Sequence, residues 1–338
     1  MSASQTAATA AEHAPRKPCT IEVLATALET VAPVAILVAV GWLCAVTKVL
    51  KEEVGDGLVA FVTTIAVPVL LARTVAGGPP LEATVLRLYA SYFAGVAVVW
   101  SIAAFTVGHL WGRGARTGMI AGVGAGFSNI VLMGIPTIGL AYGQAGLDVL
   151  FLLLAVHLPI MVTAATIHME WAVRADGVED AAFSWSATAR RIGASLGKNP
   201  FIIGIAFGLA WRATGLPFTG LADRVAGLLG NAAGPVALFA VGMSLAKYRV
   251  RGEIGPAVLI AGLSLFLLPA TVWSVAQALA MPPLWTQVAV LAASMPTGVN
   301  AYLFASYFGV AKETAAGAIV VATAGALVTA PVWLLMLS

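Results

Sequence analysis

Charged residues are scarce in this sequence. Only 10% of the 338 residues are Asp, Glu, Lys or Arg, whereas 60% are hydrophobic. A soluble domain carries about 25% charged residues, so the composition excludes a large soluble domain and predicts an all-α polytopic membrane protein in a lipid bilayer. The formal net charge of +3 is small, and the basic residues lie between apolar runs, which gives no support to nucleic-acid binding.

Cysteines and catalytic motifs are also rare. The two cysteines, Cys19 and Cys44, are isolated and have no metal-binding or redox spacing. The sequence has no nucleophile elbow, no HExxH and no Walker motif. Ser, His and Asp occur, but a triad is recognised by geometry rather than by presence. The sequence therefore predicts that the protein is not an enzyme, does not itself use ATP, and has no cofactor or metal site.

Long apolar runs fill most of the chain. A membrane-spanning helix needs about 20 apolar residues, and ten such spans fit. They are expected at roughly 27–47, 55–77, 84–110, 116–143, 147–169, 200–216, 226–247, 255–279, 284–308 and 313–337. We predict a disordered tail over 1–24, a first five-helix repeat over 25–170, a polar loop over 171–198 and a second five-helix repeat over 199–338.

Two of these spans, the fourth and the ninth, are interrupted in the middle. The ninth contains the stretch Ser294–Tyr302, in which Pro296 removes a backbone donor and Gly298 loosens the chain. The fourth contains Ser128–Thr137, where Pro136 precedes Thr137, and the pair resembles Pro296 followed by Thr297. Interrupted helices in corresponding halves point to a transporter whose site lies at the breaks, although Pro and Gly are common in membrane helices and chance can produce such a pair.

The odd number of spans in each half implies that the second half enters the membrane from the opposite side, which makes an inverted repeat. More Lys and Arg lie on the side of the central loop than on the side of the N-terminus. By the positive-inside rule, we expect the loop to be cytoplasmic and both termini to face outward. The expected location is the inner (plasma) membrane of a bacterium.

The breaks predict an anion site. A helix that restarts after a proline exposes unpaired N–H groups and about half a positive charge, which a carboxylate would satisfy. Hydroxyl, amide and phenol groups near the breaks add donors, although a hydroxyl often bonds a carbonyl of its own helix and an amide can join two helices. The candidate substrate-binding residues are Asn129, Pro136, Thr137, Ser294, Pro296, Thr297, Gly298, Asn300 and Tyr302.

His157 lies in the middle of the fifth span. An ionisable group at membrane depth is a functional candidate, and its ordinary pKa range suits proton coupling. A neutral histidine bonded between helices is an equal alternative. Neither break contains a carboxylate. The coupling ion, H⁺ or Na⁺, therefore stays open.

Several stretches resemble the auxin efflux carrier family, which includes plant auxin exporters and bacterial organic-acid carriers. They are Asn129–Gly143 (NIVLMGIPTIGLAYG), the segments around Pro68 and Pro235, and Met295–Leu335; Met295–Ala305 is most similar to the bacterial malonate-carrier branch. The resemblance implies a fold akin to sodium–bile-acid symporters, with scaffold helices 1, 2, 6 and 7 and transport helices 3–5 and 8–10. It also implies broken helices 4 and 9 that cross, an elevator motion and a homodimer.

The expected function is secondary active transport of a small organic anion, with malonate or a related dicarboxylate as the leading substrate. One alternative is an exporter of another carboxylate, such as an auxin-like aromatic acid. The other is a membrane sensor that transports nothing, although a sensor usually needs a soluble output domain and the central polar stretch is short.

Overall fold

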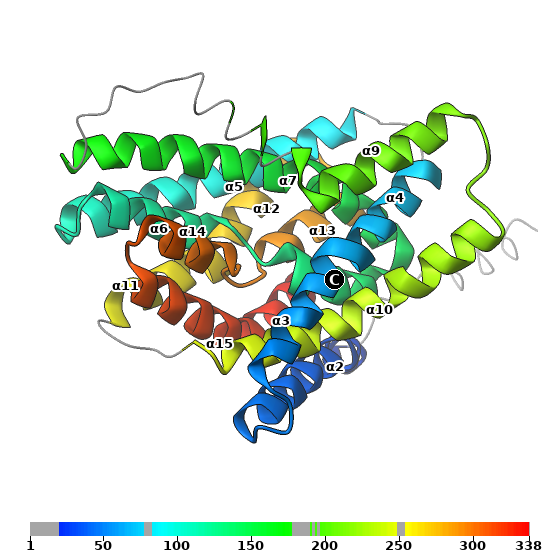
Figure 1. Cartoon of the computed structure of the whole chain (residues 1–338), viewed down its shortest axis with the longest axis horizontal. Coiled ribbons are helices and arrows are strands. Elements are labelled where there is room, and N and C mark those ends of the chain that lie inside the picture. The colour runs from blue at the N-terminus through cyan, green and yellow to red at the C-terminus, as the bar shows by residue number, and fades with distance from the viewer. Residues whose placement is uncertain are drawn as a thin grey trace, which may run out of the picture.

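The protein is helical throughout the part that the computed structural model describes, which comprises residues 20–77, 83–177, 190, 193–194, 197–248 and 254–337 (Figure 1). Among the described residues, six helices are long and apolar enough to cross a membrane: Glu52–Gly77, Thr84–Leu110, Ile130–Ala175, Leu221–Leu245, Ile254–Ala278 and Lys312–Leu337. Shorter apolar helices lie at Ala32–Val46, Pro200–Ala213 and Pro283–Ala293. The prediction of an all-α, multi-span protein is confirmed.

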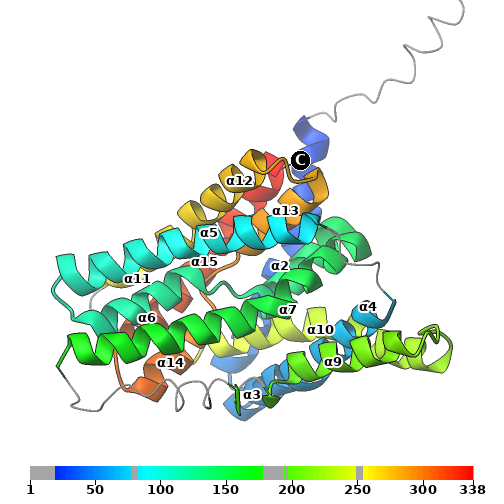
Figure 2. The ribbon, with the colours of Figure 1, turned by 90° about the horizontal axis from the view of Figure 1, so that it is seen from above.

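One set of helices, here called the α10 group, is held together by close backbone contacts. It consists of α2 (Thr20–Val46), α3 (Glu52–Phe61), α4 (Val67–Gly77), α9 (Pro200–Ala213) and α10 (Leu221–Leu245). Helix α2 packs along α10, and α4 packs along α9 (Figure 2). A Cβ at Gly242 would lie 2.0 Å from the Val38 carbonyl oxygen, and one at Gly204 would lie 2.3 Å from that of Pro68. Glycine therefore permits the close approach that membrane helices need in order to pack.

The remaining helices form a second set, the α6 group. It consists of α5 (Thr84–Phe105), α6 (Ala115–Gly126), α7 (Ile135–Ala175), α11 (Ile254–Gly262), α12 (Leu268–Ala278), α13 (Pro283–Ala293), α14 (Asn300–Phe308) and α15 (Lys312–Leu337). Helix α5 packs on α6 and α12, and α11 packs on α15 (Figure 2). Gly122, Gly124 and Gly126 of α6 face Trp100, Ile260 and Val96, so this glycine run serves helix packing as its spacing suggests.

Three prolines sit just beyond π-helical turns rather than at breaks. The turns η1 (Val62–Ala66), η3 (Ile130–Gly134) and η4 (Leu263–Leu267) each end two residues before a proline, respectively Pro68, Pro136 and Pro269. A proline ring clashes with the carbonyl of the preceding turn, and a wider π turn relieves that clash without ending the helix. A fourth π turn, η2 (Thr106–Leu110), follows α5 without a proline.

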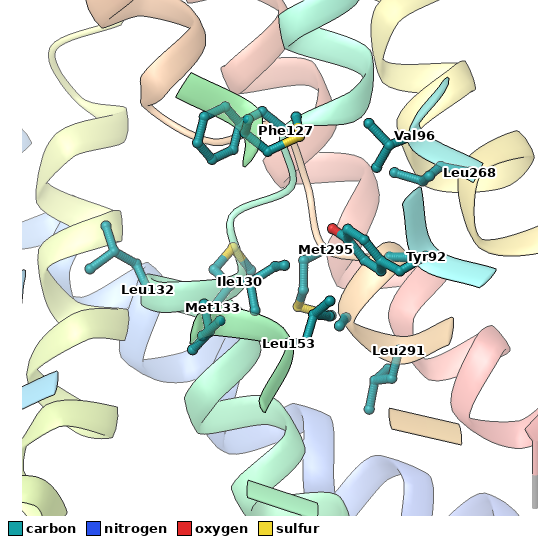
Figure 3. Close-up of a cluster of buried hydrophobic side chains, with 14 of the residues drawn as sticks. Tyr92, Val96, Phe127, Ile130, Leu132, Met133, Leu153, Leu268, Leu291 and Met295 are labelled. Carbon is teal, nitrogen blue, oxygen red and sulfur yellow. The ribbon is translucent and has the colours of Figure 1, made fainter. Parts of the chain in front are cut away.

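The chain leaves the helical path at two buried places, between Gly126 and Ile130 and between Ala293 and Asn300 (Figure 3). The second interruption contains Pro296, as predicted. The prediction of a break at Pro136 is wrong: the first interruption lies upstream, and Pro136 continues a helix from η3 into α7. Helix α7 bends instead at Gly143, where φ is 60° and ψ is −151°, near the expected boundary between the fourth and fifth spans.

Two of the predicted segments fall largely outside the described residues. Helix α2 begins at Thr20, within the expected tail 1–24, and residues 1–19 are not described. In the expected loop 171–198, α7 continues to Ala175, and residues 178–189, 191–192 and 195–196 are not described.

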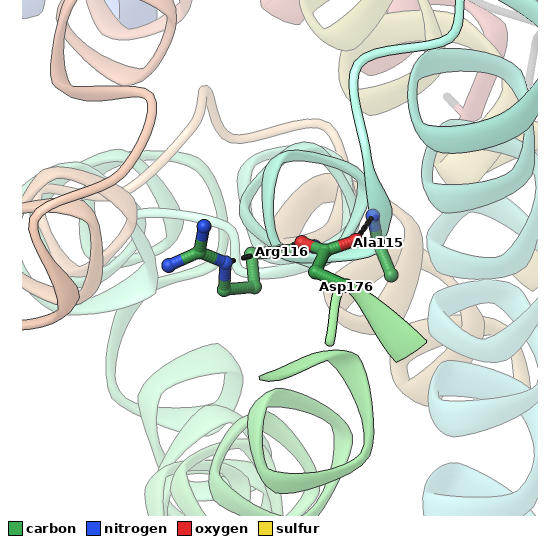
Figure 4. A network of polar contacts seen from close by, with 3 residues as sticks. All are labelled: Ala115, Arg116 and Asp176. Atoms are coloured by element: carbon green, nitrogen blue, oxygen red, sulfur yellow. Dashed lines mark hydrogen bonds and ion pairs between the residues drawn. The ribbon is translucent and has the colours of Figure 1, made fainter. Parts of the chain in front are cut away.

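Asp176 ties the end of α7 to the start of α6 (Figure 4). Its carboxylate accepts hydrogen bonds from the N–H groups of Ala115 (2.7 Å) and Arg116 (3.1 Å), and from Arg116 Nε at 3.1 Å. Burial alone would raise the pKa of Asp176, but these hydrogen bonds and the Arg116 charge outweigh it and lower the pKa below its usual value. The carboxylate is thus a cap, supplied by a distant residue, for the helix that leads into the first interruption.

We expect Asp176→Ala to destabilise the purified protein by about 1–2 kcal/mol, the usual cost of losing a helix cap. The lowered pKa means that this stabilisation is present above the pKa of the unfolded carboxyl and is lost as pH falls through the folded pKa. The difference in stability between wild type and variant, measured by thermal unfolding, should therefore have its full size at pH 7 and decrease below about pH 4.

The control for this measurement is Asp148→Ala on the same helix. The Asp148 carboxylate accepts an exposed bond from Gln144 Nε2 at 2.8 Å, and such a pair contributes about 0.2–0.5 kcal/mol. Equal effects of the two substitutions at pH 7 would show that Asp176 is not a structural cap.

Candidate functional site

The two interruptions meet and pair at the centre of the buried core. The Asn129 N–H donates to the Pro296 carbonyl at 2.7 Å, and the Gly298 N–H donates to the Phe127 carbonyl at 2.9 Å. A Cβ at Gly298 would lie 2.9 Å from the Phe127 oxygen, so a glycine lets the segments approach this closely. Figure 3 shows the two extended segments crossing among apolar side chains. We call this pairing the crossing.

Two hydroxyl groups donate to carbonyls at the ends of the helices that lead into the crossing, and each hydroxyl comes from the opposite segment. Thr297 Oγ1 donates to the Gly124 carbonyl of α6 at 2.8 Å, and Ser128 Oγ donates to the Ala293 carbonyl of α13 at 3.3 Å. Each hydroxyl thus caps the other segment's helix. The structural counterpart of Thr297 is therefore Ser128. The predicted equivalence of Thr297 with Thr137 is wrong, because Thr137 lies beyond the crossing.

The two helices that leave the crossing begin with fewer satisfied groups. Asn129 caps η3, and its Oδ1 accepts from the Leu132 N–H at 3.2 Å. Helix α14 begins at Asn300 without a side-chain cap. Among the described residues, the N–H groups of Val131 and Asn300 have no hydrogen-bond acceptor. Two helix N-termini, each with about half a positive charge, thus begin at the crossing with N–H groups that have no acceptor among the described residues.

Two of the predicted hydroxyl donors are already used within their own helices. Thr137 Oγ1 donates to the Met133 carbonyl at 2.7 Å, and Ser294 Oγ donates to the Leu291 carbonyl at 2.9 Å. For both residues the structure favours the alternative in which a membrane-helix hydroxyl bonds back to its own backbone.

The other predicted residues have different surroundings. Pro136 lies beside α10, where a Cβ at Gly234 would be 3.5 Å from the Pro136 Cβ. Asn129 is buried, and within the described part of the chain its amide nitrogen has no hydrogen-bond partner. Asn300 is half-buried at the first position of α14. The two asparagines therefore keep donors that the protein does not use.

Tyr302, on the first turn of α14, packs against Tyr248, which follows the end of α10. Their ring centroids are 5.1 Å apart with an interplanar angle of 66°. Burial raises the pKa of Tyr248 to about 12, and the negative charges of ionised Tyr302 and of Asp56 act in the same direction. The Tyr248 phenol is therefore neutral at physiological pH.

His157 lies close to the crossing, which its position in the sequence does not reveal. Its Nε2 is 3.4 Å from the Tyr92 hydroxyl, which also interacts with the Ser128 side chain. The rings of Tyr92, Phe93 and Phe127 surround it, with Phe127 edge-on at a centroid distance of 5.1 Å. Polar contacts thus connect His157 through Tyr92 to a residue of the crossing.

Sequence reasoning did not select Phe127, Ser128 or Tyr92 as site residues. A signal for Ser128 exists, because Ser128 follows Gly124 by four positions, as Thr297 follows Ala293. Tyr92 gives no such signal, since it is one aromatic residue in an apolar helix. No group of three or more His, Cys, Asp or Glu side chains that could hold a metal ion is found in the described part of the chain.

These features define a class of protein. Interrupted helices that cross inside an apolar bundle and present helix ends to a buried site are typical of secondary transporters. The chain belongs to the family described as "Membrane transport protein", whose model matches residues 26–334, and this is the auxin efflux carrier family that the sequence resembles.

Two relatives cover most of the chain. A protein of Methanothermobacter thermautotrophicus (strain Delta H) named "Uncharacterized transporter" is 26% identical over 324 residues, which are 91% of this chain and 98% of the relative. A protein of Rhizobium meliloti (strain 1021) named "Putative malonate transporter" is 28% identical over 301 residues, which are 85% of this chain and 88% of the relative.

The crossing predicts a specific cost for losing the Thr297 hydroxyl. Thr297→Val keeps the shape of the side chain but leaves the buried Gly124 carbonyl without its donor. We therefore expect the free energy of unfolding, measured by thermal unfolding, to fall by about 1–3 kcal/mol. Thr297→Ser keeps the donor and should lose less. Thr166→Val is the control, because the Thr166 hydroxyl bonds the Val162 carbonyl inside regular α7, where a backbone N–H also bonds that carbonyl. A Thr297→Val effect no larger than that of Thr166→Val would contradict the capping role.

Proposed function

We propose that the protein is a secondary active transporter of a small organic anion, with malonate or a related dicarboxylate as the substrate, bound at the crossing. The observation that carries the proposal is the imbalance between helix ends there. The carbonyls of Gly124, Leu291 and Ala293 accept hydrogen bonds from hydroxyls. The N–H groups of Val131 and Asn300 have no acceptor among the described residues.

The imbalance selects the sign of the ligand charge. Donors without partners are costly where water is excluded, and a carboxylate supplies several acceptor oxygens at once. The helix N-termini add favourable electrostatics for an anion, because backbone N–H groups and the helix dipole both attract negative charge. The amide groups of Asn129 and Asn300 would give further donors. The name of the Rhizobium relative agrees with malonate as the first substrate to test.

The proposed architecture is ten membrane-spanning helices in two inverted five-helix repeats. The six long and three shorter apolar helices support it, once α7 is divided at Gly143. The reciprocal hydrogen bonds around Ser128 and Thr297 are what a local two-fold relation between the repeats would produce. A cytoplasmic central loop, outward-facing termini and an inner-membrane location remain expectations from charge.

The proposed mechanism is an elevator motion of the α6 group against the α10 group. The segments of the crossing link α6 to η3 and α13 to α14, so a bound anion would travel with the α6 group. Turn η3 and α7 pack against α10, which places the crossing near the boundary between the groups. We propose, in addition, that the protein works as a homodimer, as family resemblance implies.

The test has two steps: malonate binding to purified protein, and then malonate uptake by the same protein in vesicles. Asn300→Ala should weaken malonate binding roughly 10- to 100-fold, because a hydrogen bond to a charged group contributes about 1.5–3 kcal/mol. Asn231→Ala is the matched control, since Asn231 is exposed on α10. A panel of dicarboxylates and aromatic acids separates malonate from an auxin-like substrate. Unchanged malonate affinity in the Asn300 variant would remove this residue from the site, and binding without uptake would favour a sensor.

We propose that His157 carries a coupled proton. Protonation would change its contact with the Tyr92 hydroxyl, and Tyr92 interacts with Ser128 of the crossing. Vesicle uptake by His157→Gln should therefore no longer respond to an imposed pH gradient. His109→Gln, at an exposed position after α5, should respond as wild type does. Uptake by His157→Gln that still follows the gradient would exclude this role and direct attention to Na⁺.

A further inference from the structure

One aromatic pair joins α14 to the segment that follows α10, beside the crossing. Tyr302 lies two residues beyond Asn300, on the turn of α14 whose N-terminus is uncapped. Tyr248 lies three residues beyond the end of α10 at Leu245. Their rings meet edge to face with centroids 5.1 Å apart. The pair therefore links the helix that begins at the crossing with the connection that follows α10 of the other group.

The two partners are anchored on opposite sides of this contact. The neighbour of Tyr248, Lys247, donates from Nζ to Asp56 Oδ1 at 2.6 Å, which ties the end of α10 to α3 within the α10 group. The Tyr248 N–H donates to the Leu245 carbonyl at 3.3 Å. Helix α14 packs mainly against α6 and α15, within the α6 group. Because the Tyr248 N–H bonds to the end of α10, a displacement of α14 relative to α10 would separate the two rings.

We propose that the Tyr248–Tyr302 pair is a gate that closes the approach to the Asn300 end of the crossing. This inference rests on the proposed function, since it assigns a means of controlling access to the same site. In this structure, Val299, Asn300 and Tyr302 are all half-buried. Contact between two aromatic rings suits a gate, because their separation breaks no buried ion pair.

Cysteine accessibility tests the gate without using any substrate. The reporter is Val299→Cys, at the residue before α14, in a background carrying Cys19→Ser and Cys44→Ser. Purified protein in detergent is treated with a small charged methanethiosulfonate, and the rate of modification is measured. Tyr248→Ala should raise this rate roughly 2- to 10-fold, the change that loss of one aromatic pair implies.

Two controls give the result its meaning. Tyr248→Phe keeps the ring and should leave the rate within about twofold of the background, since the aromatic contact does not need the hydroxyl. Tyr307→Ala removes a tyrosine that is 79% exposed on the same helix and should also leave the rate unchanged. Thermal unfolding of each variant shows that it is folded, and Tyr248→Leu replaces Tyr248→Ala if the alanine variant unfolds.

An unchanged modification rate in Tyr248→Ala, or in its leucine replacement, would overturn the gate. An increase of equal size in Tyr307→Ala would overturn it too, because the effect would then reflect general loosening of α14. The readout involves no malonate, so failure of the gate is distinguishable from failure of the proposed transport function, which the uptake assay tests separately.

Discussion

The central constraint on this protein is that backbone groups inside a bilayer must find partners within the chain. Interrupting two helices in an apolar core leaves N–H and carbonyl groups that lipid cannot satisfy. Two backbone hydrogen bonds at the crossing, from Asn129 to Pro296 and from Gly298 to Phe127, meet part of this demand. The hydroxyls of Ser128 and Thr297 meet more of it. Among the described residues, the N–H groups of Val131 and Asn300 at the crossing remain without an acceptor.

The division into helix groups follows from where small residues occur. Glycines bring α2 against α10 and α4 against α9, at distances that a side chain would not allow. Glycines of α6 likewise accept Trp100 of α5 and Ile260 of α11. Each group is thus closely packed inside, and the crossing belongs to the α6 group while η3 contacts α10. The crossing therefore lies in the α6 group, next to the boundary with the α10 group.

Around the crossing, aromatic and polar groups connect functions that are far apart in the sequence. Phe127 contributes its backbone to the crossing and its ring to the surroundings of His157. Tyr302 lies on the turn that bears Asn300 and contacts Tyr248, three residues beyond α10. Side chains from α5, α7, α14 and the segment after α10 thus lie close to the crossing, although they are far apart in the sequence.

How much the sequence alone determined can be judged from particular residues. Composition and the apolar runs determined the all-helical membrane class, because lipid leaves a chain few ways to pair its backbone. Pro296 and Gly298 located the second interruption, since proline removes a donor and glycine allows close approach. The family resemblance also came from the sequence. For Pro136 the local rule failed, because a π turn absorbs the proline and the helix continues.

Only the tertiary structure decided which residues face one another. It paired Ser128 with Thr297, placed His157 beside Tyr92 and Phe127, and showed that Thr137 and Ser294 bond within their own helices. Local sequence encodes where a helix weakens, because that depends on one turn of backbone. It does not encode which distant segment supplies the missing hydrogen bonds, because that depends on how the packed helices cross.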